Sequence, residues 1–315
     1  MVEFGAYLPQ IDVDYDVLKR VAFECESYGF HSVWLTDHML PFYGSLQRSY
    51  FECWTTLSAL AEATKNLRLG TLVLCNLFRY PSVLAKMAAT LDVISGGRLE
   101  FGIGAGWLKP EFDAYGIPFP KASVRIAMLR EALEVMKRMW LENEPVFHGR
   151  YYSINGAVCN PKPLQKPHPP IWIGTLIGGR LMSETIVKYA NGWVIGSLYL
   201  PSPEEYKQKV EDLKFHFSNA GRKFESLKKA LGIGCLLAEN KAKLNEKIGK
   251  FKPVKVSVGK YQKTQELICA TPDECIKTLE KYVDTGVDLF IMNFPDVTTL
   301  EPVKLFGEQV IPSFK

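Results

Sequence analysis

The sequence LGTLVLCNLFRYPSVLAKMAATLDVISGGRLEFGIGAGW, residues 69–107, forms one complete strand–helix–strand unit. The run from Leu69 to Leu74 is short, aliphatic and β-branched, which is typical of a strand buried on both faces of a parallel sheet. Pro81 suits the first turn of the helix that follows, and Gly96-Gly97 ends that helix. A second buried run then leads into a glycine-rich loop. The stretch therefore predicts two parallel strands joined by a crossover helix.

Both strands of this unit end in residues that are unusual for a strand interior. Parallel α/β folds place their chemistry at the carboxyl ends of the strands, so these residues predict a site. They are Cys75, Asn76 and Arg79 after the first strand, and Gly102, Gly104, Gly106 and Trp107 at the second.

The same alternation of strand and helix continues along the whole chain. The predicted strands cover residues 2–8, 31–35, 69–74, 98–103, 171–174, 192–195, 231–237 and 288–293. The predicted helices cover about 14–28, 51–64, 81–95, 123–141, 178–190, 203–220, 241–250, 272–285 and 300–309. Eight strand–helix units in succession predict a (β/α)₈ TIM barrel, with residues 1–315 as a single domain. Surface excursions are expected at about 143–169 and 240–265.

A doubly wound sheet is the competing architecture. It would place a G-x-G-x-x-G fingerprint after its first strand. The glycine run FGIGAGW does not have that spacing and follows the fourth predicted strand. The barrel is therefore the preferred fold.

Composition restricts the function classes. The 315 residues are 47% hydrophobic and 23% charged, and the net charge of +4 is dispersed along the chain. This charge is too weak and too scattered for a nucleic-acid or membrane surface. Seven cysteines without C-x-x-C spacing argue against a disulfide framework and a structural zinc site. With no signal-peptide pattern, we expect a cytoplasmic, metal-free protein whose partner is a small-molecule substrate.

Several motifs together resemble one known family. The chain is similar to the bacterial-luciferase-like superfamily of flavin- and deazaflavin-dependent oxidoreductases, and within it to the branch that uses coenzyme F420. The resemblance spans about residues 4–196 and rests on GAYLPQ, WLTDH, GTLVLCNLFRYP, ATLDVISGGRLEFGIGAGWLKPEF, YGIPF, HGRYYSI, PKPLQKPHPPIWIG and YANGWVIG, in that order. It implies the luciferase-like TIM barrel and a homodimer.

Asp37 and His38 follow the second predicted strand, so both are expected at the mouth of the barrel. A histidine there can act as acid or base near neutral pH. On the residues alone, a histidine that only hydrogen-bonds within its loop is the alternative. The resemblance implies that His38 transfers the proton of the reaction. Asp37 would orient His38 or bind the polar edge of the cofactor.

The resemblance also implies a surface that holds the cofactor ring. At Leu72-Val73 it implies a non-proline cis peptide that supports the ring, and a plain trans strand is the alternative. Cys75 and Asn76 would offer hydrogen bonds to the ring. Further along the chain, Gly104 and Gly106 would let it approach the backbone, and Trp107 would form an apolar wall.

The segment from Thr175 to Arg180 resembles the family's phosphate-binding turn, which implies that it binds the cofactor's phosphate. Thr175, Gly178 and Gly179 precede a helix whose N-terminus suits an anion, Arg180 would add charge, and Gly196 would neighbour them. An ordinary helix start is the alternative. The lysines between residues 241 and 263 are expected to be a solvated face, or else a basic lid over the cofactor.

The expected function is hydride transfer between coenzyme F420 and a small organic substrate such as an alcohol, aldehyde or enone. A monooxygenase that uses reduced FMN is the first alternative, and a non-catalytic flavin-binding protein is the second. Sugar-phosphate dehydrogenases of this branch carry a carboxylate where Trp107 stands and a tryptophan where Phe42 stands. Sugar-phosphate oxidation is therefore not expected.

Overall fold

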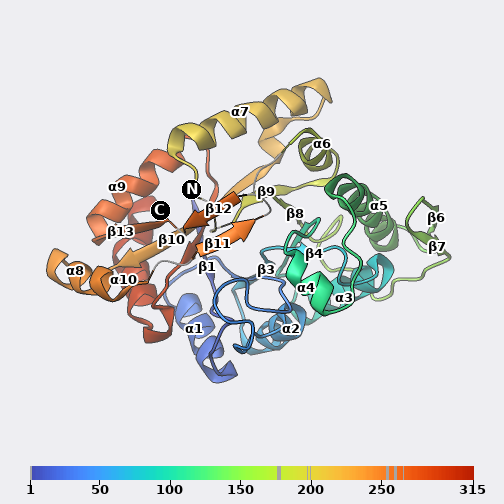
Figure 1. Ribbon diagram of the computed structural model, residues 1–315. Helices are drawn as coiled ribbons and strands as arrows, with labels where there is room; N and C mark the ends of the chain where they lie inside the picture. Colours follow the sequence, from blue (N-terminus) through green and yellow to red (C-terminus); the bar gives the residue numbers. More distant parts are fainter. Residues whose placement is uncertain are drawn as a thin grey trace.

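The computed structural model describes residues 2–175, 179–196, 198, 200–252, 255–258, 261–264 and 266–315, with only the backbone described in 255–258 and 261–264. Within these residues, eight parallel strands form a closed barrel, which confirms the predicted TIM fold (Figure 1). Closure follows because β10 pairs with β9 on one side and with β14 on the other. The barrel strands are β1 (Glu3–Tyr7), β2 (Ser32–Leu35), β3 (Arg68–Thr71), β5 (Leu99–Gly104), β8 (Ile171–Gly174), β9 (Gly192–Ile195), β10 (Lys228–Leu237) and β14 (Leu289–Asn293).

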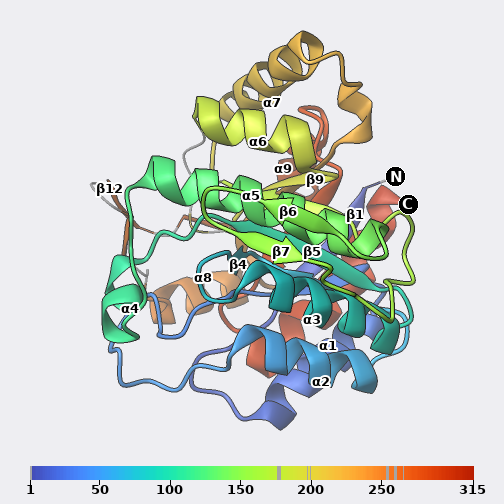
Figure 2. The ribbon, with the colours of Figure 1, turned by 90° about the vertical axis from the view of Figure 1, so that its right-hand side faces the viewer.

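Helices surround the barrel, as Figures 1 and 2 show from two directions. They are α1 (Tyr15–Ser27), α2 (Cys53–Ala63), α3 (Pro81–Ile94), α5 (Ala122–Leu141), α6 (Arg180–Tyr189), α7 (Pro203–Asn219), α9 (Pro272–Val283) and α10 (Glu301–Gln309). Each buries one apolar stripe against the strands; in α1 the stripe is Leu18, Val21, Ala22 and Cys25. In the described part of the chain, none of the helices has an apolar stretch long enough to span a bilayer.

The barrel interior is filled by side chains, and Trp34 of β2 and Trp172 of β8 dominate it. Their rings lie 5.7 Å apart at 88° and pack with smaller residues of β9, β10 and β14. Leu72 and Val73 lie against this cluster on the side of the carboxyl-terminal ends of the strands. The interior cluster therefore supports Leu72 and Val73, and with them any ligand that binds on these two residues at the carboxyl-terminal end of the barrel.

The third predicted strand, 69–74, is divided into two. β3 ends at Thr71, and the two-residue strand β4 (Leu74–Cys75) follows; β3 and β4 both pair with β5. The Leu72–Val73 peptide bond between them is cis, as the resemblance implied.

The two surface excursions contain short strands. β6 (Val146–His148) and β7 (Ser153–Asn155) form the small hairpin expected between 143 and 169. The second excursion contains α8 (Lys241–Lys250), as predicted, and an antiparallel pair, β11 (Lys255–Val258) and β12 (Tyr261–Thr264), that was not predicted. β13 (Leu267–Ala270), also unpredicted, pairs in parallel with the end of β10.

The short elements complete the chain. α4 (Lys109–Ala114) follows β5 and was missed by the sequence analysis. The one-turn helices are η1 (Phe224–Ser226), η2 (Val297–Thr299) and η3 (Ile311–Phe314).

Gly102 of β5 offers a direct test of this packing. A Cβ atom there would lie 1.9 Å from the backbone oxygen of Thr71, which cannot move away without breaking the pairing of β3 with β5. We predict that Gly102→Ala lowers the free energy of unfolding in urea by about 3 kcal/mol. Gly249→Ala in α8, where no atom lies within 4 Å of the added carbon, is the control and is expected to be neutral or stabilising. Equal stability of the two variants would contradict the description.

Candidate functional site

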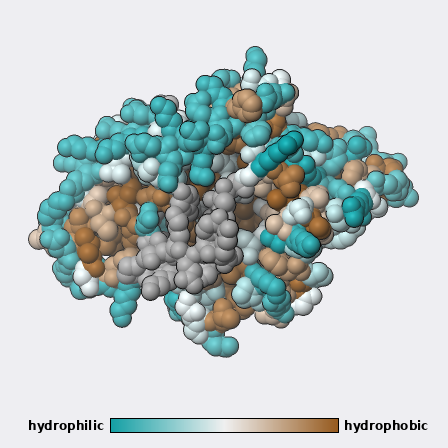
Figure 3. Space-filling model, turned by 45° about the horizontal axis from the view of Figure 1, so that its top comes forward, coloured by the Kyte–Doolittle hydropathy of each residue, from teal (hydrophilic) through white to brown (hydrophobic). Residues whose placement is uncertain are grey.

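A cavity of about 1290 Å³ opens at the carboxyl-terminal end of the barrel. Figure 3 shows that hydrophilic residues cover most of the outer helices, with hydrophobic residues in several patches between them. The cavity exceeds the 300–1,000 Å³ that is usual for one small ligand, so it has room for a large cofactor and a substrate together. Its lining includes Tyr7, Thr36, Asp37, His38, Phe42, Leu72, Val73, Cys75, Gly104, Gly106, Trp107, Glu111, Arg125, Thr175, Met182, Gly196 and Leu198.

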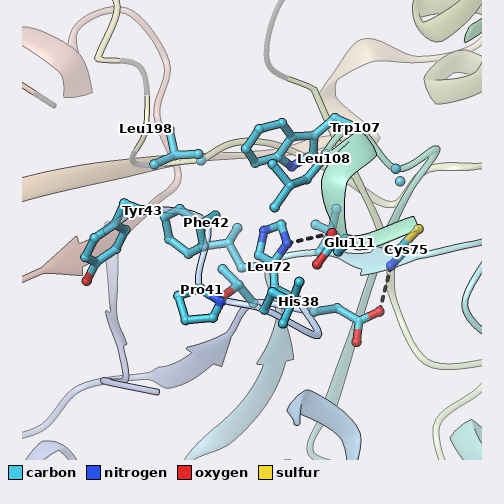
Figure 4. A pocket seen from close by; sticks show the side chains of 18 of the residues that line it. His38, Pro41, Phe42, Tyr43, Leu72, Cys75, Trp107, Leu108, Glu111 and Leu198 are labelled. Atoms are coloured by element: carbon cyan, nitrogen blue, oxygen red, sulfur yellow. Dashed lines mark hydrogen bonds and ion pairs between the residues drawn. The ribbon is translucent and has the colours of Figure 1, made fainter. Parts of the chain in front are cut away.

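His38 lies in this cavity and is held by Glu111 of α4 (Figure 4). The distance from His38 Nδ1 to Glu111 Oε1 is 2.9 Å, and Glu111 Oε2 accepts a hydrogen bond from the backbone of Met39 at 3.0 Å. Both side chains are buried, with exposures of 8% for His38 and 2% for Glu111. Trp107 stands perpendicular to the imidazole at 5.6 Å, and the ring of Phe42 lies 5.0 Å away.

This geometry fixes the proton arrangement of the imidazole. A carboxylate can only accept, so Glu111 favours the tautomer with the proton on Nδ1. Among the described residues, His38 Nε2 has no hydrogen-bond partner. His38 can therefore exchange a proton with a bound ligand through Nε2.

Asp37 does not orient His38, which corrects that prediction. Its carboxylate receives two hydrogen bonds from Arg79, at 2.8 and 2.9 Å, and one from the backbone of Cys75 at 2.8 Å. The side chains of Asp37 and Arg79 are both largely buried, and such a paired geometry offsets the cost of burying their charges. Asp37 therefore fixes the backbone that follows β4.

Cys75 and Asn76 occupy different surroundings. Cys75 lines the cavity, and burial raises the pKa of its thiol, so the thiol stays protonated and unreactive near neutral pH. Asn76 is not among the lining residues: its side-chain amide donates to the hydroxyl of Tyr152 at 3.4 Å. The backbone N–H of Asn76 donates to the carbonyl of Gly104 at 3.0 Å, and its side-chain oxygen is buried without a partner among the described residues, so its predicted contact with a ring stays a prediction.

The floor of the cavity is formed by Val73 between glycines. A Cβ atom at Gly104 or Gly174 would lie 3.0 or 2.7 Å from a methyl group of Val73, so only glycine admits this branched side chain. A Cβ atom at Gly196 would meet no atom within 4 Å, and this position keeps the cavity open. The apolar floor beside Trp107 therefore fits a flat ring system.

Gly106 has the left-handed backbone conformation, with φ of +76°. A Cβ atom there would lie 2.7 Å from Cys75 Sγ. The glycine lets the loop that carries Trp107 pass close to Cys75.

The predicted phosphate turn is only partly at the cavity. Thr175 lines the cavity, and its hydroxyl accepts from Trp193 Nε1 at 2.8 Å. Gly179 precedes α6 with φ of +113° and open space beside its α-carbon, while Gly178 lies outside the described residues. The side chain of Arg180 is 85% exposed, pairs with Glu184 and does not line the cavity. The structure thus does not bring its charge to the site as predicted.

Two cavity residues were missed by the sequence analysis. Glu111 lies on a six-residue helix, which is too short to show periodicity. Arg125, in the first turn of α5, lines the cavity and stacks on Phe119, with 3.9 Å between the guanidinium carbon and the ring centre. The part of the lysine-rich segment after Lys252 lies outside the residues whose side chains are described, so the basic lid stays a prediction.

No group of three or more His, Cys, Asp or Glu side chains that could hold a metal ion occurs in the described ranges. This finding covers the cavity residues named above.

Comparison with known proteins identifies relatives of the whole chain. The family model for luciferase-like monooxygenases matches residues 2–267. An F420-dependent glucose-6-phosphate dehydrogenase of Amycolatopsis mediterranei is 25% identical over 324 residues, which cover 95% of this chain and 94% of the relative.

Solved structures share the fold. An F420-dependent secondary alcohol dehydrogenase in complex with an F420–acetone adduct superposes with a TM-score of 0.83 at 22% identity, covering 100% of this chain and 99% of that chain. The monooxygenase RslO1 from Streptomyces bottropensis gives a TM-score of 0.80 at 22% identity, covering 99% and 100%. At these identities the likeness establishes the TIM fold.

We predict that Glu111→Gln changes the tautomer of His38. If the amide oxygen accepts from Met39, its NH₂ group faces Nδ1 and favours the form protonated on Nε2. Nitrogen NMR of histidine-labelled protein would show His38 with a proton on Nδ1 in the unsubstituted protein and a large fraction on Nε2 in the variant. Tyr115→Phe, which removes a hydrogen bond to the carbonyl of Met39, is the control. Unchanged His38 shifts in Glu111→Gln would show that Glu111 does not set the tautomer.

Proposed function

Because the chain belongs to the luciferase-like monooxygenase family, we propose that it is a coenzyme F420-dependent oxidoreductase acting on a small, largely apolar alcohol, aldehyde, ketone or enone. The observation that carries the proposal is the His38–Glu111 pair, which lies in an apolar cavity above the Val73 floor. The F420-dependent relative that spans nearly the whole chain supports the choice of cofactor.

The cavity residues fit a deazaflavin. Leu72, Val73, Gly104 and Trp107 would hold the ring between an apolar floor and an aromatic wall, and Thr175 and Gly196 border the space left for its tail. Coenzyme F420 accepts or donates a hydride when bound. The protein contributes position, exclusion of water and a proton route.

His38 carries the proton in this proposal. In the oxidation of an alcohol, bound coenzyme F420 would take up the hydride of the carbinol C–H bond, and His38 Nε2 would accept the hydroxyl proton. In the reverse direction, Nε2 returns a proton to the oxygen formed from the carbonyl. Glu111 holds the imidazole in place and stabilises its positive charge while the proton resides there.

The wall near His38 favours an apolar substrate. Pro41, Leu108 and Leu198 line the same cavity as the imidazole and its neighbours Phe42 and Trp107 (Figure 4). The only carboxylates among the described lining residues are Asp37 and Glu111, and both are engaged within the protein. The hydroxyl groups of a sugar would find few partners here, so we propose that the substrate differs from that of the sugar-phosphate dehydrogenases.

We predict that His38→Ala lowers turnover by about 10² to 10⁴-fold, because general acid–base catalysis contributes that much. The rate is read from the absorbance of F420 with a secondary alcohol, or of reduced F420 with a ketone or enone. Affinity for oxidised F420, followed by fluorescence, is expected to remain. His148→Ala, on the exposed hairpin, is the control. Unchanged turnover in His38→Ala would remove the proton role, and tight binding of FMN with none of F420 would contradict the proposed cofactor.

The substrate proposal has its own test. We predict that Leu198→Ser raises the KM for a cyclohexyl ketone about tenfold, because it removes apolar contact from the pocket. Leu164→Ser, at an exposed position outside the cavity, is the control. Efficient oxidation of glucose 6-phosphate by the unsubstituted enzyme, with poor use of apolar alcohols and ketones, would refute the apolar assignment.

A further inference from the structure

Arg125 is a cation in the cavity, and none of the described acidic side chains pairs with it. Its Nη1 donates to the carbonyl of Pro120 at 2.6 Å, and its Nε is buried without a hydrogen-bond partner among the described residues. A buried guanidinium N–H that loses water normally gains another acceptor, because leaving it unpaired is costly. The unused donor of Arg125 therefore points to a group that the free chain does not supply.

The charges of the cavity point to the same conclusion. Asp37 pairs with Arg79, Glu111 with His38, Lys109 with Asp113 and Lys250 with Glu246. Among the described charged residues of the lining, Arg125 and Lys252 have no acidic partner. The charge left uncompensated in the cavity is therefore positive.

Aromatic packing places Arg125 on the cavity wall beside the cofactor floor. Its guanidinium stacks on Phe119, and the Phe119 ring lies 4.7 Å from that of Phe112. The end of the Phe112 ring in turn lies 3.0 Å from the position of a Cβ atom at Gly106. This stack presets the direction of the guanidinium, since one of its faces is covered.

Arg125 belongs to α5, the helix that contacts the beginning of α6. Further along α5, Arg130 donates to the carbonyl of Leu181 in the first turn of α6, at 2.7 Å. The open space beside Gly179 and the side chain of Met182, which also lines the cavity, belong to the same helix start.

We propose that Arg125 is the anion-binding residue of the cavity and receives a phosphate or carboxylate group of a bound ligand. This inference rests on the proposed function and adds an anionic group to it. That group is either the phosphate of the cofactor or a carboxylate on a substrate that is otherwise apolar. Guanidinium suits both, because its donors match two oxygens of either anion. It replaces the earlier assignment of Arg180, whose guanidinium pairs with Glu184 outside the cavity.

The test compares Arg125→Gln with Arg125→Lys and with Arg180→Gln as the matched control. Circular dichroism and thermal melting first establish that the variants fold. Inorganic phosphate is then titrated into each protein without cofactor by calorimetry. We expect binding that Arg125→Gln weakens by about 10- to 100-fold, that Arg125→Lys partly restores, and that Arg180→Gln leaves unchanged.

Two further titrations distinguish the sources of the anion. If the cofactor's phosphate is the ligand, Arg125→Gln weakens F420 binding by the same factor and leaves binding of the phosphate-free deazaflavin chromophore unchanged. If a substrate carboxylate is the ligand, F420 affinity is unchanged, and the KM of a keto acid rises about tenfold while that of its methyl ester does not.

The proposal is overturned if Arg125→Gln alters none of these measurements, or if Arg180→Gln alters them equally. If the proposed function is wrong but the anion site is real, the binding measurements give a different result. In that case neither F420 nor the chromophore binds to any of the proteins, while phosphate binding that depends on Arg125 is still measurable.

Discussion

The hydrogen bond between Glu111 and His38 joins two parts of the chain that are 73 residues apart. One end follows β2 and the other lies on α4, so the bond fixes two loops of the barrel mouth to each other. Because both side chains are buried, the hydrogen bond between His38 Nδ1 and Glu111 Oε1 replaces the contacts with water that these two atoms have lost. The aromatic wall of Phe42 and Trp107 packs around the same imidazole. The shape of the substrate space and the direction of His38 Nε2 therefore follow from one contact.

Side-chain packing inside the barrel is a second constraint, and it acts on the floor of the cavity. Trp34 and Trp172 inside the barrel support Leu72 and Val73. Gly104 and Gly174 leave room for the branched side chain of Val73. Asp37 holds the next residues in place through the backbone of Cys75. The floor is thus built from packing and backbone contacts, while the chemistry is concentrated in the loops above it. This division between a rigid scaffold and functional loops is the usual arrangement in TIM barrels.

The barrel could be predicted from the sequence because its signals are local. Each buried run of four to six residues and each proline or glycine at a helix end is readable in a short window. Pairing between side chains that are far apart in the sequence cannot be read in such a window. Asp37 is adjacent to His38, but neighbouring residues after a strand point in different directions, and Asp37 turns to Arg79 instead. The hydrogen bond of Glu111 with His38 forms only when the loops that carry the two residues have folded, so no short stretch of sequence predicts it.

The other differences between the sequence-based predictions and the structure also have specific physical causes. Arg180 was assigned to an anion because the segment from Thr175 to Arg180 resembles the family's phosphate-binding turn, although the spacing to Glu184 is that of a helical ion pair. β11 and β12 lie in a polar, lysine-rich stretch without a run of apolar residues. The single-domain organisation, the homodimer and the cytoplasmic location stay predictions.

The proposed reaction passes a hydride directly between a deazaflavin and a substrate in this cavity. Its most direct test uses reduced F420 that carries deuterium at the ring carbon from which the hydride leaves. Turnover with an apolar ketone or enone is followed in the absence of oxygen. If hydride transfer is direct, we expect a product with deuterium on the carbon that was reduced. A product without deuterium, or turnover that requires oxygen, would contradict it.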